Sequence, residues 1–244
     1  MKTNSSIILS NYIRAYALKM VHEAKASHIG GSFSIADILA VLYEDILYLN
    51  PKNQYLRKRD RLILSKGHCC SALYATLALK KFFKVSELSN FGKFGSDLMS
   101  HVSHKIKGVE FSTGSLGHGL PFGVGKALMS KLARKKWGVF VIMSDGELNE
   151  GSNWEALMFA SHHNLDNLTI IIDYNKLQSL TSVEETIRME PLKKRFDSFG
   201  CYTTEIDGHN HFDLKKSLSK KNKSKNCPKV IIAHTTKGKG VSFM

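Results

Sequence analysis

Two polar residues, each just past the end of an apolar run, have the types and spacing best suited to chemistry. Asp145 follows the run at 138–143, Asn175 follows the run at 168–172, and the two lie 30 positions apart. One β-α-β crossover has about that length. Parallel strands place both residues at the same edge of a sheet, where open α/β sheets bind ligands. A carboxylate and a carboxamide there favour Mg²⁺, which takes few protein ligands and adds phosphate oxygens and water.

The same two residues also have a purely structural interpretation. Asp is common at helix N-caps and Asn is common in turns. The spacing alone leaves the metal site and the structural role equally open.

Strands and helices alternate along the chain. Apolar runs predict strands at 61–64, 138–143, 168–172, 202–206 and 229–234. Helical spacing predicts helices at 5–25, 35–49, 69–81, 120–135, 191–199 and 213–220, with one more between Asp145 and the 168–172 run. This alternation predicts an α/β fold, a three-layer sandwich with a mostly parallel central sheet.

The connections carry their own signals. We expect the Gly30-Gly31 pair to stop the first helix, and Ser34 with Asp37 to cap the second in a capping-box-like pairing. Residues 91–119 are polar and rich in Gly, Ser and His, and a loop of that length in a compact domain is usually functional. A further loop is expected at 178–190.

Composition excludes several classes of protein. The chain has 244 residues, 43% of them hydrophobic, which is enough for a sizeable core and argues against disorder. No run approaches a membrane span and no apolar leader is evident, so we expect neither. Four cysteines without CxxC spacing suggest reduced thiols in a cytoplasmic protein.

The net charge of +14 leaves nucleic acid, an acidic partner or phosphorylated ligands open. Much of this charge lies at 215–229, a run without interleaved aromatic residues or a recognition motif. We interpret that run as a solvated helix and loop, and we expect no nucleic-acid partner. The Lys- and Asn-rich character also fits a simple bias in genome composition.

Five motifs in one order carry a family resemblance. They are SHIGG at 27–31, SKGH at 65–68, LMSH at 98–101, GVEFSTGSLGHG at 108–119 and DGELNEG at 145–151. With Asn175, the last motif resembles the thiamine diphosphate signature, a Gly-Asp-Gly followed after about 30 residues by Asn. Together the motifs resemble the N-terminal part of transketolase, over roughly residues 13–240. The chain is most similar to the free-standing N-terminal subunit of a split transketolase.

This resemblance implies a single thiamine diphosphate-binding domain of the PP type over residues 1–244. It implies that seven residues bind the cofactor: His68, Gly114, Ser115, Leu116, Asp145, Gly146 and Asn175. It implies that Asp145, Asn175 and the Leu177 carbonyl hold Mg²⁺ together with two diphosphate oxygens.

The resemblance also implies catalytic roles. His28 and His101 correspond to histidines that face the substrate, and Glu150 to a carboxylate in a hydrogen-bond network across the interface between subunits. If the loop register differs by three residues, His104 takes the role of His101. His118 has two open interpretations, an ordinary surface side chain or a polar role near the cofactor loop. The remaining histidines are interpreted as ordinary hydrogen-bonded side chains: His22, His162, His163, His209 and His211.

The chain departs from the family pattern at several points. Ser144 replaces the first Gly of the signature, which would strain the turn if that position required a positive φ. The glutamate that activates the cofactor belongs to the pyrimidine-binding domain, which family members carry in their C-terminal half. A family histidine beyond the segment 237–240 is also missing, either because the chain is trimmed or because this protein lacks it.

The resemblance implies a transferase that moves a two-carbon ketol unit from a ketose phosphate to an aldose phosphate. We expect activity only with a separate C-terminal subunit that supplies the pyrimidine-binding domain and its glutamate, in an α2β2 assembly. Two alternatives stay open. One is a related subunit that uses an unusual sugar or a keto acid, and the other is a non-catalytic subunit that keeps the fold for assembly.

Overall fold

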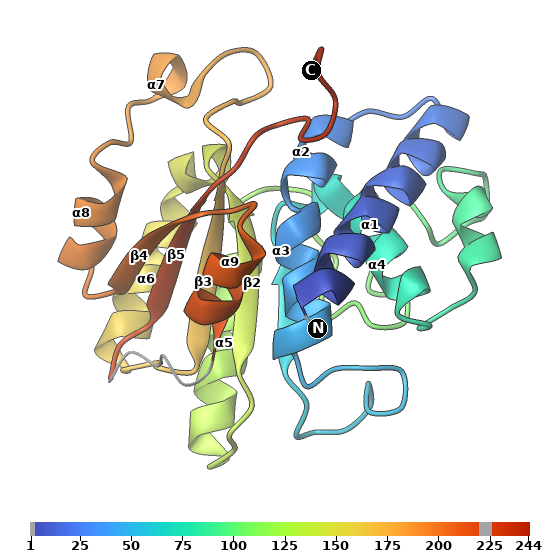
Figure 1. The fold of residues 1–244 in the computed structure, drawn as a ribbon. Helices are drawn as coiled ribbons and strands as arrows, with labels where there is room; N and C mark the ends of the chain where they lie inside the picture. The colour runs from blue at the N-terminus through green and yellow to red at the C-terminus, as the bar shows by residue number, and fades with distance from the viewer. Residues whose placement is uncertain (1–2, 220–225) are drawn as a thin grey trace.

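A computed structural model describes residues 3–219 and 226–244, and a five-stranded, all-parallel sheet forms its centre (Figure 1). The strand order is β1-β2-β3-β5-β4. The strands are β1 (Arg61–Leu64), β2 (Val139–Ser144), β3 (Leu168–Tyr174), β4 (Tyr202–Asp207) and β5 (Lys229–His234). They match the strands predicted from the sequence to within two residues at each end.

Helices cover both faces of this sheet. One face is covered by α1 (Thr3–Glu23), α3 (Ala36–Val41), α4 (Cys70–Leu79) and α9 (His211–Leu218), and the other by α5 (Gly119–Leu132), α6 (Gly151–His162) and α8 (Leu192–Ser198). Short helices and turns complete the chain: α2 (Ile29–Ser34), α7 (Val183–Thr186), η1 (Leu42–Ile46), η2 (Gly67–Cys69), η3 (Val85–Asn90) and η4 (Gly146–Asn149). None of the helices within the described residues is long and apolar enough to cross a membrane.

The alternation of strand side chains explains why three layers form. Phe140 and Ile142 of β2 belong to the core under α1, α3 and α4, whereas Val139, Val141 and Met143 belong to the core under α5 and α6. Successive side chains of a strand point to opposite faces, so a strand that is apolar at every position must be covered on both sides. The predicted three-layer α/β sandwich is therefore confirmed.

Two predicted helix boundaries are wrong. Gly30 and Gly31 do not stop a helix but lie inside α2, and α1 already ends at Glu23. A Cβ at Gly31 would lie 2.8 Å from Cys69 Sγ, so glycine there allows close packing rather than chain termination. Ser34 caps nothing, because its hydroxyl is turned toward other acceptors, with Oγ 2.8 Å from Gly31 O and 2.6 Å from Asp173 Oδ2.

Other differences are small. The helix predicted at 35–49 divides into α3 and the π-helical turn η1, and the loop predicted at 178–190 contains α7. Residues 91–119 form the expected long loop, apart from the first residue of α5. The helix predicted at 213–220 is α9, which begins at His211, and Lys220 lies outside the described residues.

Candidate active site

A cavity of about 670 Å³ lies where the carboxyl ends of β1, β2, β3 and β5 meet α2. Ligand cavities commonly have this size. It is lined by residues from five separate stretches of chain: 28–31, 66–68, 144–146, 175–181 and 237–238, with Leu116 and Met244. Among the residues predicted from sequence, His28, His68, Leu116, Asp145, Gly146, Asn175 and Leu177 all line it.

Asp145 begins the turn that follows β2 and is only 2% exposed. Its Oδ1 accepts a hydrogen bond from Gly146 N at 2.8 Å and its Oδ2 accepts one from Lys176 N at 2.6 Å. Burial, reinforced by the charge of Asp173, raises the pKa of Asp145 to about 6. Within residues 3–219 and 226–244 no Lys, Arg or His side chain forms an ion pair with Asp145, and the nearby charge of Lys66, which lowers the pKa of Asp145, is paired with Asp173.

Asn175 and Leu177 form the turn that follows β3. Asn175 Oδ1 accepts a hydrogen bond from Leu177 N at 3.1 Å, and its Nδ2 lies 3.2 Å from Asp173 Oδ2. Between them Lys176 has a φ of 67°, and its amide binds Asp145. The turns after β2 and β3 are therefore joined directly, which brings the predicted metal ligands to one corner of the cavity.

A buried ion pair between Lys66 and Asp173 lies behind this corner, and sequence reasoning missed it. The two side chains are 1% and 0% exposed. Asp173 also accepts hydrogen bonds from Ser34 Oγ and Thr235 Oγ1. Burial lowers the pKa of Lys66, but the Asp173 carboxylate outweighs it and the pKa is raised overall. Lys66 belongs to the SKGH motif, and that motif was the sequence feature that could have placed Lys66 near the site.

His28 and His68 line the cavity, and His101, which does not, lies beside His28. The ring centroids of His28 and His68 are 5.2 Å apart, and those of His28 and His101 are 6.1 Å apart. Burial, with the charges of Lys66 and the other two rings, lowers the pKa of His68 to about 3. Burial, His101 and Lys237 lower the pKa of His28 as well. Both rings are therefore neutral at neutral pH.

The loop at 91–119 places His101, and not His104, beside His28. His101 lies beside His28, and a Cβ at Gly114 would be 3.5 Å from the His101 ring. His104 is exposed and its Nδ1 contacts Ser112 Oγ at 2.6 Å instead. Ser115 is exposed, and neither it nor Gly114 lines the cavity.

The structure does not bring Glu150 into the cavity. Glu150 is exposed at the start of α6. Glu147, which sequence reasoning did not select, is fully buried instead. Its Oε1 accepts hydrogen bonds from Ser65 Oγ at 2.5 Å and Gly117 N at 3.0 Å, and burial raises its pKa. Glu147 thus joins the ends of β1 and β2 to the loop that carries Leu116.

Ser144 in place of glycine is not strained. It is the last residue of β2 and does not have a positive φ. Its Oγ accepts a hydrogen bond from Glu147 N at 3.2 Å. The turn that carries Asp145 therefore forms without the glycine of the family signature.

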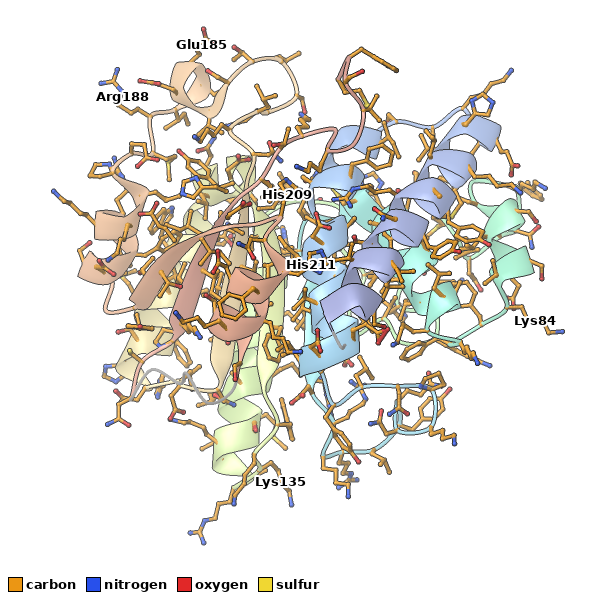
Figure 2. The ribbon with its side chains drawn as sticks, viewed as in Figure 1. Lys84, Lys135, Glu185, Arg188, His209 and His211 are labelled. Carbon is orange, nitrogen blue, oxygen red and sulfur yellow. The ribbon has the colours of Figure 1, made fainter. Side chains whose placement is uncertain are left out.

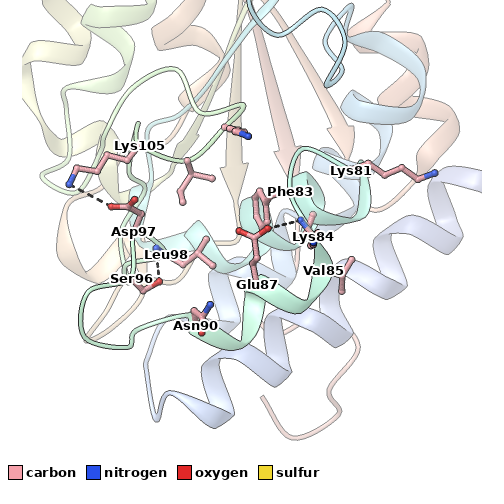
Figure 3. A pocket seen from close by; sticks show the side chains of 13 residues that line it. Lys81, Phe83, Lys84, Val85, Glu87, Asn90, Ser96, Asp97, Leu98 and Lys105 are labelled. Carbon is pink, nitrogen blue, oxygen red and sulfur yellow. Dashed lines mark hydrogen bonds and ion pairs between the residues drawn. The ribbon is translucent and has the colours of Figure 1, made fainter.

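A larger cavity, of about 850 Å³, lies between η3 and residues 96–107 (Figure 3). It contains none of the predicted site residues. Figure 3 shows Lys105 directed at Asp97, with 3.5 Å between the charged groups, and Lys81 extending away from the cavity. Convergent polar groups, rather than volume, therefore identify the cavity at the strand ends as the candidate site.

The strand-end cavity fits a magnesium diphosphate group. A buried carboxylate that forms no ion pair within the described residues, a carboxamide and a carbonyl supply hard oxygen ligands. Within residues 3–219 and 226–244 no group of three or more His, Cys, Asp or Glu side chains could hold a metal ion. A site with one carboxylate would therefore depend on ligand oxygens to complete the coordination of Mg²⁺.

The fold and the cavity define an α/β protein that binds a diphosphate cofactor at the carboxyl edge of a parallel sheet. Residues 5–243 match the family model described as transketolase, thiamine diphosphate binding domain. The chain belongs to the transketolase family, as the sequence motifs predicted.

Two relatives are named as transketolase subunits, and this chain covers more than four fifths of each. One is a subunit of the apulose-4-phosphate transketolase of Phocaeicola vulgatus, to which this chain is 41% identical over 231 residues, covering 95% of this chain and 82% of that protein. The other is a 6-deoxy-6-sulfo-D-fructose transketolase subunit of a Clostridium species, with 38% identity over 235 residues, covering 96% and 86%.

A solved structure is similar over the whole fold. The transketolase of Campylobacter jejuni matches with a TM-score of 0.90 and 32% identity, over 99% of this chain. This chain spans only 38% of that transketolase. The similarity therefore covers the cofactor-binding part of a longer enzyme.

Proposed function

We propose that this chain is the diphosphate-binding subunit of a transketolase that uses thiamine diphosphate and Mg²⁺, and that it is a single domain over residues 1–244. The observation that carries the proposal is the cavity that unites Asp145, Asn175 and Leu177 with His28 and His68. These groups come from separate parts of the sequence and correspond to the family's cofactor-binding residues and, for His28, to a histidine that faces the substrate.

Asp145, the Asn175 side chain and the Leu177 carbonyl would hold the metal, and Gly146 would let the backbone approach the diphosphate. Gly114, Ser115 and Leu116 would line the cofactor, with Leu116 at the cavity wall. When bound, thiamine diphosphate supplies the nucleophilic carbon and the electron sink needed to break and form a C–C bond beside a carbonyl.

The histidines of the chain would move protons. His28 is a neutral imidazole because burial, His101 and Lys237 lower its pKa, so its ring can accept a proton from a substrate hydroxyl at neutral pH. His101 lies 6.1 Å from His28 and would face the same substrate. His68 is neutral and adjoins Lys66, which suits hydrogen bonding to the cofactor rather than proton transfer.

A second polypeptide would complete the site. It would supply the pyrimidine-binding domain and the glutamate that activates the cofactor, in an α2β2 assembly. The relative from Phocaeicola vulgatus is itself named as one subunit of its transketolase. Glu150 is exposed at the start of α6, where it is available to a partner chain. We place the protein in the cytoplasm, where the buried thiols of Cys69, Cys70 and Cys201 would stay reduced.

The substrates would be a ketose and an aldose, in the first instance phosphorylated sugars of the pentose phosphate type. A second candidate is an unusual ketose, favoured because two relatives are named for apulose 4-phosphate and 6-deoxy-6-sulfo-D-fructose. Comparing xylulose 5-phosphate with these two donors distinguishes the candidates.

Reconstitution tests the proposal. The full chain alone should show no ketol transfer, and a chain carrying the pyrimidine-binding domain should restore it. In the reconstituted complex, Asp145→Ala should abolish Mg²⁺-dependent cofactor binding, whereas Asp97→Ala, on an exposed loop, should not. Activity of the chain alone contradicts the two-chain enzyme, and unchanged affinity in Asp145→Ala contradicts the metal site.

A further inference from the structure

The segment 235–238 follows β5, and its last two residues, Lys237 and Gly238, line the cavity, so we call this segment the cavity wall. In Figure 1 this segment crosses from β5 over the sheet to α2. Gly238 N donates to Gly30 O at 3.0 Å, and Lys237 Nζ donates to Gln178 O at 2.9 Å. The wall therefore connects α2 to the turn that carries the proposed metal ligands.

One backbone amide of this wall donates to a side chain rather than to a carbonyl. Thr236 N lies 2.9 Å from Nε2 of His209, which is in the connection between β4 and α9. A backbone N–H can only donate, so Nε2 must carry a lone pair and no proton. The ring is therefore neutral, with its proton on Nδ1.

The other side of the His209 ring requires the same tautomer. Nδ1 lies 2.7 Å from Asp37 Oδ2, and a carboxylate accepts the Nδ1 proton. The ring of His209 is 11% exposed, and Figure 2 shows it beside His211, near α1 and α3. Both neighbours of the ring thus agree on one protonation state.

Asp37 is itself held as a carboxylate. Arg14 donates to both of its oxygens, at 3.2 and 2.5 Å, and His211 Nε2 lies 3.0 Å from Oδ1. Burial raises the pKa of Asp37, but hydrogen bonds from His209, His211 and Arg14 outweigh it and hold the pKa well below its usual range. Asp37 therefore remains an acceptor for His209 throughout the neutral range.

We propose that His209 is a positioning residue that holds the cavity wall at 235–238 in place. Asp37 selects the Nδ1-protonated tautomer, and the free Nε2 lone pair fixes Thr236 and with it Lys237. The relevance of this wall to the cofactor rests on the proposed function. The hydrogen bond itself does not, so the two can be tested separately.

Two measurements on the full chain test the hydrogen bond. Long-range ¹H–¹⁵N correlation of the histidine rings reads the tautomer of His209, and hydrogen exchange reads the protection of the Thr236 amide. We expect an Nδ1-protonated neutral ring. In His209→Phe we expect exchange at Thr236 to be about tenfold faster, the factor for one lost hydrogen bond. An Nε2-protonated ring, or unchanged exchange in His209→Phe, overturns the proposal.

Two further variants separate positioning from general loosening. His209→Gln places an acceptor oxygen near the ε position and should restore most of the protection at Thr236. His211→Phe is the matched control, because His211 contacts the same carboxylate and Ser6 but not Thr236, and it should leave Thr236 protected. Equal loss of protection in His209→Gln and His211→Phe would show general loosening and overturn the proposal.

Cofactor binding tests the functional consequence. In the complex with its partner subunit, His209→Phe should weaken thiamine diphosphate binding by up to about tenfold, and His209→Gln should recover it. Unchanged affinity in His209→Phe overturns the positioning role. Absence of cofactor binding in the wild-type complex, with Thr236 still protected, would instead contradict the proposed function.

Discussion

The metal-free chain should lose stability through Asp145 as the pH rises. Folding raises the pKa of this carboxyl from 3.8 to about 6, so the native state binds more protons than the unfolded state between these values. The contribution of Asp145 to stability is therefore fully present below the unfolded pKa and is lost as the pH rises through the folded pKa. The side chain is 2% exposed, so solvent screening does not remove the effect.

The magnitude follows from the shift in pKa. A shift of about two units corresponds to roughly 3 kcal/mol at neutral pH, of which about 2 kcal/mol develops between about pH 4.5 and 7. Asp145→Asn removes the titrating group while keeping the shape of the side chain. Relative to the wild type, this variant should therefore gain about 2 kcal/mol of stability across that pH interval.

Urea unfolding of the full chain at both pH values, with a chelator present, measures this difference. The comparison uses the change in the free energy of unfolding between the two pH values. The cost of replacing one acceptor oxygen by an amide is the same at both pH values and therefore cancels. Asp97→Asn is the control and should follow the wild type, because its carboxyl is exposed. If the wild type and Asp145→Asn differ in free energy of unfolding by the same amount at both pH values, the raised pKa of a buried Asp145 carboxyl is refuted.

Three further outcomes are expected. Lys66→Met leaves the Asp173 carboxylate buried without its cation and should lower the free energy of unfolding by about 3–5 kcal/mol in urea titrations; a loss below about 1 kcal/mol contradicts the pairing. His101→Ala should lower turnover of the reconstituted enzyme with cofactor affinity unchanged, and the matched His104→Ala should not. Ser144→Gly should leave the cofactor dissociation constant within about twofold, because Ser144 adopts a normal strand conformation; a much tighter complex would show that Ser144 impairs the turn.

The strands and the composition of the cavity were predictable because both depend on local patterns. Each strand is a short apolar run, and because β2 and β3 are buried on both faces, nearly every position of the run is a buried position of the strand. Once the strands are parallel, residues just past their ends must share one edge, so Asp145 and Asn175 converge. His28 and His68 follow from their motifs.

The polar residues beneath the cavity were not predictable from local patterns. Lys66 and Asp173 pair across 107 positions, and nothing near either residue indicates the other. Glu147 and Glu150 are three residues apart in one motif, and the geometry of η4 alone decides which is buried. Gly31 shows the same limit, because its neighbour Cys69 comes from a distant turn.

The strand order has a consequence for when the site can form during folding. β5 follows β4 in the sequence but lies between β3 and β4, so the sheet is continuous only after β5 has inserted. The residues that line the cavity range from His28 to Met244, and the segment after β5 closes against α2. Non-local parallel pairing of this kind forms slowly, so a partly synthesised or partly folded chain presents no complete cofactor site. In the proposed two-chain complex, cofactor loading would therefore require this sheet to be finished, and a ligand that binds only the finished sheet would stabilise all five strands at once.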